Sequence, residues 1–218
     1  MNKILHRNRK SKLGIIINNH IINHKKEYLI VIILFLIGLV IGIMFVNNLN
    51  ETQYSEIDTY IKKIVNNLKA IEKINYTDLL KESIITNLIV ILVIWIASST
   101  IIGIPIVYGN LIFRGFVLGY TLSSIISVLG IGNGTFFIIS GLFLHNIIFI
   151  PVILATSVSG MKLYKSIVKN RERENVKIEF IRHTVFCTVM ATVLLIASLI
   201  EVYISTNLSK FIVNYIKI

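Results

Sequence analysis

Three polar residues inside long apolar stretches are the first candidates for chemistry in this sequence of 218 residues. Arg114 lies among Ile, Phe, Val and Leu residues, and His145 and Asn146 are adjacent in a second apolar stretch. Polar groups are costly in lipid, so such residues can mark a substrate or proton path. The structural alternatives are an Arg114 side chain that extends to the lipid head groups, and an interhelical hydrogen bond for His145 and Asn146.

The residues that catalysis would require do not converge in the sequence. A zinc protease would need two His with a Glu at helical spacing, and the chain has no His-Glu-x-x-His motif. An intramembrane aspartyl hydrolase needs paired acids, whereas Glu201 stands alone within the apolar stretches. There is no P-loop. We therefore predict no enzyme activity, no cofactor and no metal site.

The composition is typical of a membrane protein. The chain is 55% hydrophobic and only 15% charged, with a mean hydropathy of +0.77, which is more apolar than a soluble domain of this size needs. The net charge of +11 could indicate nucleic acid, but the basic residues gather beside apolar stretches without a base-stacking pattern. Anionic lipid head groups are the expected counter-charge, and no nucleic-acid partner is predicted.

Five stretches contain the roughly 20 mostly apolar residues that a helix needs to cross the hydrocarbon core. They are Tyr28–Val46, Ile84–Ile102, Ile106–Val128, Phe136–Val158 and Thr184–Ile204. Helices are expected because backbone groups in lipid must be satisfied within their own segment. The predicted fold is therefore all-α, a polytopic membrane protein with about five transmembrane helices in one membrane domain, residues 28–204.

The distribution of Lys and Arg predicts the orientation, because cytoplasmic segments carry the excess of these residues. Residues 1–27 and 161–183 hold seven basic residues each, whereas residues 47–83 hold five against six acidic ones. We therefore predict that the N-terminal segment and the loop 161–183 are cytoplasmic. The loop 47–83 and a short C-terminal tail, residues 205–218, are then extracytoplasmic.

The loop 47–83 is predicted to contain an amphipathic helix, because its apolar residues recur at steps of three and four. These residues are Ile57, Ile61, Ile64, Val65, Leu68, Ile71 and Ile74. The apolar face rests either on the membrane or the outer end of the bundle, or it binds another protein. The candidate partner-binding residues are Ile61, Leu68 and Ile71. A shorter segment, residues 13–22, is typical of a membrane-surface helix on the inner side.

Two Gly-x-x-x-Gly motifs predict close helix packing. They are Gly38 with Gly42 and Gly115 with Gly119, and the missing side chains allow two helix backbones to approach. Packing within the chain is the default interpretation, and contact with a partner or a second copy of the chain is the alternative.

Three segments resemble the stage II sporulation protein M family. They are Ile102-Gly103-Ile104-Pro105, Arg114-Gly115-Phe116-Val117-Leu118-Gly119-Tyr120 and His145-Asn146-Ile147-Ile148-Phe149-Ile150-Pro151. The resemblance covers nearly the whole chain, from the basic start and first span to the basic loop before the last span. Phe149 stands where the wider family often has a Glu, which favours the sporulation branch over a transport-like activity.

The resemblance implies a non-enzymatic scaffold in the cell membrane, at the mother-cell septal or engulfing membrane. The family's sporulation members recruit two cell-wall hydrolases, stage II sporulation proteins D and P, for septal wall thinning and forespore engulfment. The alternative is a transporter or permease-like subunit in which Arg114, His145 and Asn146 line a path. The two hypotheses differ in whether these three side chains face a hydrated cavity or pack against neighbouring helices.

Overall fold

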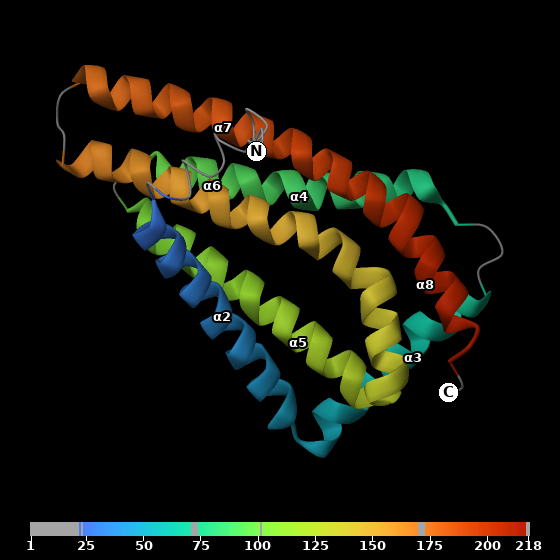
Figure 1. Ribbon diagram of the computed structural model, residues 1–218. Coiled ribbons are helices and arrows are strands. Elements are labelled where there is room, and N and C mark those ends of the chain that lie inside the picture. The colour runs from blue at the N-terminus through green and yellow to red at the C-terminus, as the bar shows by residue number, and fades with distance from the viewer. Residues whose placement is uncertain (1–21, 23, 71–73, 101, 170–172, 217–218) are drawn as a thin grey trace, which may run out of the picture.

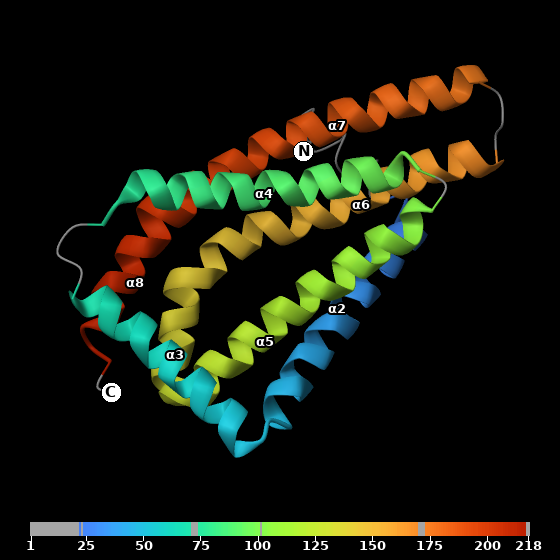
Figure 2. The same ribbon diagram turned by 180° about the vertical axis from the view of Figure 1, so that it is seen from behind.

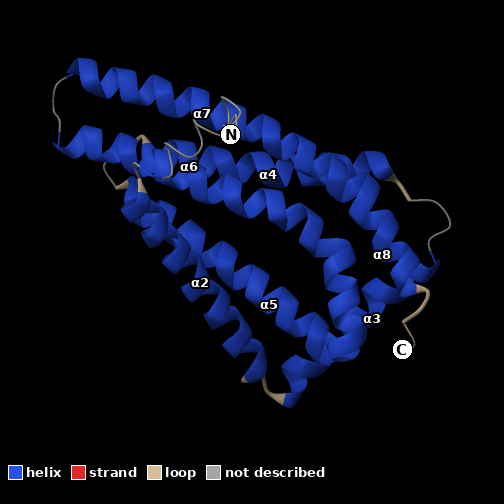
Figure 3. Ribbon diagram, in the orientation of Figure 1, coloured by secondary structure: helices blue, strands red, loops and turns tan. Residues whose placement is uncertain are grey.

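The computed structural model describes residues 22, 24–70, 74–100, 102–169 and 173–216, and these form helices and connecting turns without a strand (Figures 1 and 3). This confirms the predicted all-α class. The helices are α2 Lys25–Asn47, α3 Glu51–Ala70, α4 Tyr76–Ser98, α5 Gly103–Ile138, α6 Leu144–Lys169, α7 Arg173–Ile200 and α8 Thr206–Val213. A π-helical turn, η1 Ile139–Phe143, joins α5 to α6, and a second one, η2 Glu201–Ser205, joins α7 to α8. The predicted inner surface helix at 13–22 lies outside the described residues, except for Ile22.

Within the described residues, four continuous helical stretches are long and apolar enough to cross a membrane. They are Lys25–Asn47, Tyr76–Ser98, Gly103–Val168 and Asn175–Val213. The third stretch has 66 residues and contains two predicted spans, 106–128 and 136–158. The chain is therefore a polytopic membrane protein, while the number of five spans and the orientation stay predictions.

The long third stretch reverses direction at the end of α5 that is remote from α7 (Figures 1 and 2), and the helix is kinked at Gly130. Gly130 has φ 78° and ψ 164°, a conformation that only glycine adopts readily. After this residue the chain passes through η1 and returns as α6. The reversal places α5 and α6 at an angle to each other, joined at one end.

Helices α2 and α5 pack side by side with their backbones in contact (Figure 1). A Cβ atom on Gly38 would overlap the carbonyl oxygen of Ile112, and one on Gly115 would overlap that of Phe35. Gly42 and Gly119 lie in the same way against the opposite backbone. The two predicted glycine motifs therefore face each other within one chain.

A second packed region lies between α4, α6 and α7. Ile94, Ile153 and Leu194, one from each helix, are completely buried there. Other large apolar side chains of these helices stay exposed, among them Ile89 and Ile147. Large exposed apolar surfaces are unusual in soluble proteins but normal in contact with lipid tails.

The predicted amphipathic helix is α3, and it packs with α8 across the end of the bundle where α5 reverses (Figure 2). We call these two helices the α3–α8 platform. Ile61 and Val65 are buried against Ile125 of α5 and Val213 of α8. Lys69 Nζ donates a 2.8 Å hydrogen bond to the carbonyl oxygen of Ile216.

The apolar face of α3 thus rests on the end of the bundle, which is the first of the two predicted alternatives. Leu68 is partly buried at the edge of the same cluster, and Ile71 lies outside the described residues. A partner contact through Ile61, Leu68 and Ile71 stays a prediction.

Candidate functional site

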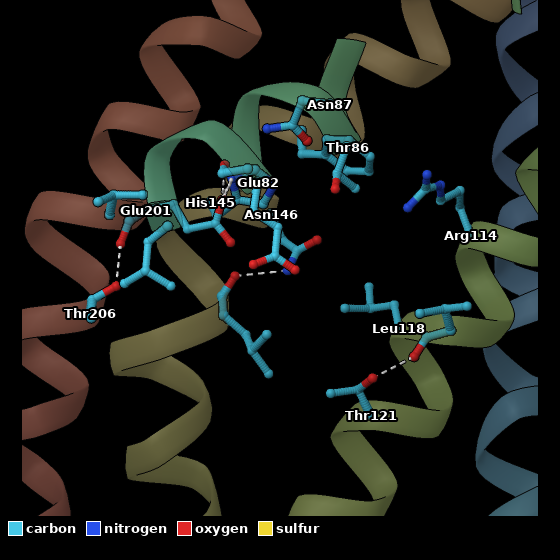
Figure 4. Close-up of a pocket in the computed structure, with 16 residues that line it drawn as sticks. Glu82, Thr86, Asn87, Arg114, Leu118, Thr121, His145, Asn146, Glu201 and Thr206 are labelled. Carbon is cyan, nitrogen blue, oxygen red and sulfur yellow. Dashed lines mark hydrogen bonds and ion pairs between the residues drawn. The ribbon is translucent and has the colours of Figure 1, made fainter. Parts of the chain in front are cut away.

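Arg114, His145 and Asn146 line one cavity of about 420 Å³, although they come from different helices (Figure 4). Arg114 lies on α5, whereas His145 and Asn146 lie on the first turn of α6. The other polar lining residues come mainly from α4 and from η2 with the start of α8. They are Glu82, Ser83, Thr86, Asn87, Thr121, Glu201 and Thr206.

The wall formed by α4, α6 and η2 contains a contact between a histidine and a carboxylate. His145 Nδ1 lies 3.3 Å from Glu201 Oε2, but the two atoms are not aligned for a hydrogen bond, and Nδ1 has no other partner in the described part of the chain. Their attraction therefore depends on a protonated imidazole. Ser83 Oγ donates a 2.5 Å hydrogen bond to the same Oε2 atom, so this carboxylate joins α4 to η2.

The two asparagines of the cavity have structural hydrogen bonds. Asn146 Nδ2 donates to the carbonyl oxygen of Leu142 at 2.8 Å, within its own turn of helix. Asn87 Nδ2 donates to Ser198 Oγ at 2.8 Å and joins α4 to α7 inside the core. The hydrogen bond of Asn146 is therefore local and not interhelical as expected. Asn87, which the sequence analysis did not name as a candidate, makes an interhelical hydrogen bond instead.

Arg114 has a different environment, because its guanidinium points into the cavity without an acidic partner (Figure 4). The guanidinium carbon lies 5.6 Å from the centre of the Phe149 ring, a distance that allows a cation–π contact. Its Nε atom is buried and has no hydrogen-bond partner, and no described carboxylate lies within 4.0 Å of the guanidinium. Arg114 is thus a cation without a counter-charge among the residues that the structure places.

The sequence analysis also did not identify a group formed by the buried His183 and Cys187 and the half-buried Ser159. Ser159 Oγ lies 2.9 Å from His183 Nδ1, and Cys187 Sγ lies 3.5 Å from His183 Nε2. Such pairs occur in nucleophilic catalysis, but the His183 side chain is only 1% exposed, which prevents access of a substrate. The contact joins α6 to α7.

The polar cavity therefore offers a ligand both charge and hydrogen-bonding groups. Arg114 can supply positive charge, and the Thr86 hydroxyl can donate a hydrogen bond. The hydroxyls of Thr121 and Thr206 already donate to the carbonyl oxygens of Val117 and Glu201. Within the described residues there is no group of three or more His, Cys, Asp or Glu side chains that could hold a metal ion.

Comparison with known proteins assigns most of the chain to one family. The sequence model of the family described as stage II sporulation protein M matches residues 31–206. An uncharacterised protein of Methanocaldococcus jannaschii is 26% identical over 199 residues, which cover 87% of this chain and 99% of that protein. No solved structure matches the chain. The matched region begins in α2 and ends at the start of α8, so it includes α3 and every residue that lines the cavity.

Proposed function

Because the chain belongs to the stage II sporulation protein M family, we propose that it is a non-enzymatic membrane scaffold that holds cell-wall hydrolases at the membrane. By the family resemblance, these hydrolases are stage II sporulation proteins D and P. The scaffold would act at the mother-cell septal or engulfing membrane, where the wall is thinned and the forespore is engulfed.

The observation that carries this proposal is the α3–α8 platform, which lies on the side predicted to face the wall. Its side chains include Tyr60, 66% exposed, and Phe211, 59% exposed, and exposed aromatic residues are common anchors of protein interfaces. The platform is joined to the rest of the bundle by Tyr54, whose hydroxyl donates to the carbonyl oxygen of Ser127 at 2.9 Å. Tyr76 donates to Asn207 Oδ1 at 2.8 Å. These bonds would give a bound enzyme a fixed position relative to the membrane.

The test uses exposed residues of α3, because Asp at the buried Ile61 or Val65 would disrupt the platform itself. Tyr60 and Ile64 are exposed on the same helix. The double variant Tyr60→Asp with Ile64→Asp should reduce recovery of the hydrolases in a pull-down from sporulating cells by about tenfold or more, since anchor residues each contribute about 2 kcal/mol.

The matched control is Asn66→Asp, which adds a charge at another exposed position of α3. It should leave recovery of the hydrolases unchanged. The amount of each variant in the membrane is measured in parallel. Equal recovery with the double variant and with the wild type, at equal membrane level, would contradict recruitment through this face.

A transporter or permease-like subunit is the second candidate, because Arg114, His145 and Asn146 share a cavity. A path requires that the cavity become accessible from both sides of the membrane in turn. Cys187 is the single cysteine of the chain, so Asn146→Cys in a Cys187→Ser background gives one reporter thiol. Labelling by a membrane-impermeant reagent from both sides supports a path, and labelling from one side only contradicts it.

A further inference from the structure

The position of Arg114 in the predicted span 106–128 favours the binding of an anion that the described part of the chain does not supply. Arg114 lies eight residues inside the predicted span 106–128, which is about 12 Å along a helix. A cation at this depth is costly unless it is paired or reaches water. Its Nε atom is nevertheless buried without an acceptor. The structure therefore has an unpartnered donor at the wall of a cavity large enough for a ligand.

An apolar groove of about 370 Å³ adjoins this polar cavity between α5 and the η1–α6 segment. Leu122, Ile138, Phe143 and Ile150 are among its lining residues. Leu118, Leu142 and Asn146 line both the groove and the polar cavity. The two spaces are thus adjacent parts of one depression, with a cation at one end and hydrocarbon side chains at the other.

We propose that the polar cavity and the adjoining groove form one binding site for a phosphate-bearing lipid. The lipid phosphate accepts hydrogen bonds from the Arg114 guanidinium, and an acyl or other hydrocarbon chain lies in the groove. Arg binds phosphate through charge-assisted hydrogen bonds, and the groove offers the chain the same apolar surroundings as the bilayer. Neither a free anion nor a purely apolar molecule would complement both ends of the depression.

The acidic residues of the cavity are compatible with an anionic head group. Glu201 Oε2 already accepts the hydrogen bond of Ser83 and lies beside His145. Glu82 is exposed and lies near the N-terminal end of α4. Arg114 is the cavity's only Arg or Lys side chain among its described lining residues, so the phosphate is expected there.

The test measures lipid retention by the full chain, purified in detergent and freed of lipid. Native mass spectrometry follows the binding of phosphatidylglycerol, of diacylglycerol, which has no phosphate, and of inorganic phosphate alone. We expect phosphatidylglycerol to bind and the other two to bind at least about tenfold more weakly. Arg114→Gln should reduce the affinity for phosphatidylglycerol by about tenfold or more, the effect of losing a charged hydrogen bond.

The matched control for the head group is Lys62→Gln. Lys62 is half-exposed on α3, outside the polar cavity and the groove, and pairs with Asp58 at 2.8 Å, so its replacement removes the same charge from a surface site. It should leave the affinity for phosphatidylglycerol unchanged, and Arg114→Lys should retain part of that affinity. Equal affinity of the wild type and Arg114→Gln would overturn the proposal. Equally tight binding of inorganic phosphate alone would overturn the role of the lipid chain.

A second pair of variants tests the groove independently of Arg114. Ile147→Trp narrows the groove, whereas Ile89→Trp adds the same ring at a similarly exposed position of α4 outside the groove. Ile147→Trp should weaken phosphatidylglycerol binding several-fold, and Ile89→Trp should not. Identical affinities for the two variants would contradict placement of the chain in the groove.

This site and the proposed scaffold can fail separately. If Arg114→Gln lowers hydrolase recovery but leaves lipid affinity unchanged, Arg114 pairs with an acidic group of a protein partner, and the lipid proposal is wrong. If lipid affinity falls while hydrolase recovery is unchanged, the lipid site is supported and does not depend on recruitment.

Discussion

The two sides of α5 differ in how closely they pack against their neighbours. The closed face, toward α2, is in direct backbone contact, whereas the open face, toward α4 and α6, borders the polar cavity. On the face toward α2, Gly115 and Gly119 allow direct backbone contact. On the face toward α4 and α6, the side chains of Arg114, Leu118 and Thr121 line the cavity. Residues that are adjacent in the sequence, Arg114 and Gly115, therefore belong to opposite kinds of surface. The closed face determines where α5 lies, and the open face leaves space for a ligand.

The orientation of the chain determines which side of the membrane the α3–α8 platform faces. A topology reporter fused to the chain tests this orientation with an all-or-none result. A reporter that is active only outside the cytoplasm should work when fused after Ile218 and fail when fused at Asn170, because residues 161–183 carry seven basic residues. The opposite pattern would place the α3–α8 platform in the cytoplasm, where it could not meet enzymes of the cell wall.

The closed face should tolerate almost no change. Gly38→Leu or Gly115→Leu forces α2 and α5 apart, because even a Cβ atom overlaps a carbonyl group there. We expect a loss of about 3 kcal/mol in the free energy of unfolding and a lower level of protein in the membrane. Gly109→Leu is the matched control on α5, since no atom lies within 4 Å of a Cβ at that position. Equal membrane levels for Gly115→Leu and Gly109→Leu would contradict the close contact.

The open face should respond in the opposite direction when its charge is removed. In detergent freed of lipid, Arg114→Met should increase the free energy of unfolding by about 2 kcal/mol, because it removes a half-buried cation that lacks a counter-charge among the described residues. The unfolding transition of the purified protein provides the measurement. A decrease in stability would indicate that the contact with Phe149 outweighs the cost of the unpaired charge.

A smaller effect is expected at the hydrogen bond that joins α4 to η2 beside the cavity. Ser83→Ala removes the donor to Glu201 and should reduce the free energy of unfolding by about 1 kcal/mol. Thr121→Ala is the control within the cavity, because the Thr121 hydroxyl donates only to Val117 of its own helix. Equal stability of the two variants would show that this bond contributes little to the cavity wall.

The features that the sequence predicted depend on local patterns. Apolar length indicated the helices, and the spacing of Gly38 with Gly42 and of Gly115 with Gly119 indicated close packing. The three- and four-residue spacing of apolar residues such as Ile61 and Leu68 indicated an amphipathic helix. In each case the physical cause acts between residues a few positions apart, so the signal is present in a single segment.

The features that the sequence did not predict depend on contacts between distant segments. Ser83 and Glu201 are 118 residues apart, and Ser159 meets His183 across two helices. The reversal near Gly130 lies between the predicted spans 106–128 and 136–158, so its position was predicted, but the sequence did not indicate which of Gly130, Gly132 and Gly134 turns the chain. Arg114, His145 and Asn146 could be selected as candidates, but their common cavity depends on how four helices pack.

The π-helical turn η2 has a consequence for the register of α8. The backbone N–H of Thr206 donates to the carbonyl oxygen of Glu201, five residues earlier, so the turn contains one residue more than an α-helix would. Each residue of an α-helix adds about 100° of rotation. Deletion of one residue in η2 would therefore restore a regular helix and rotate Ser209 and Val213, the buried residues of α8, out of alignment with α3. The extra residue in η2 therefore determines which side chains of α8 face α3.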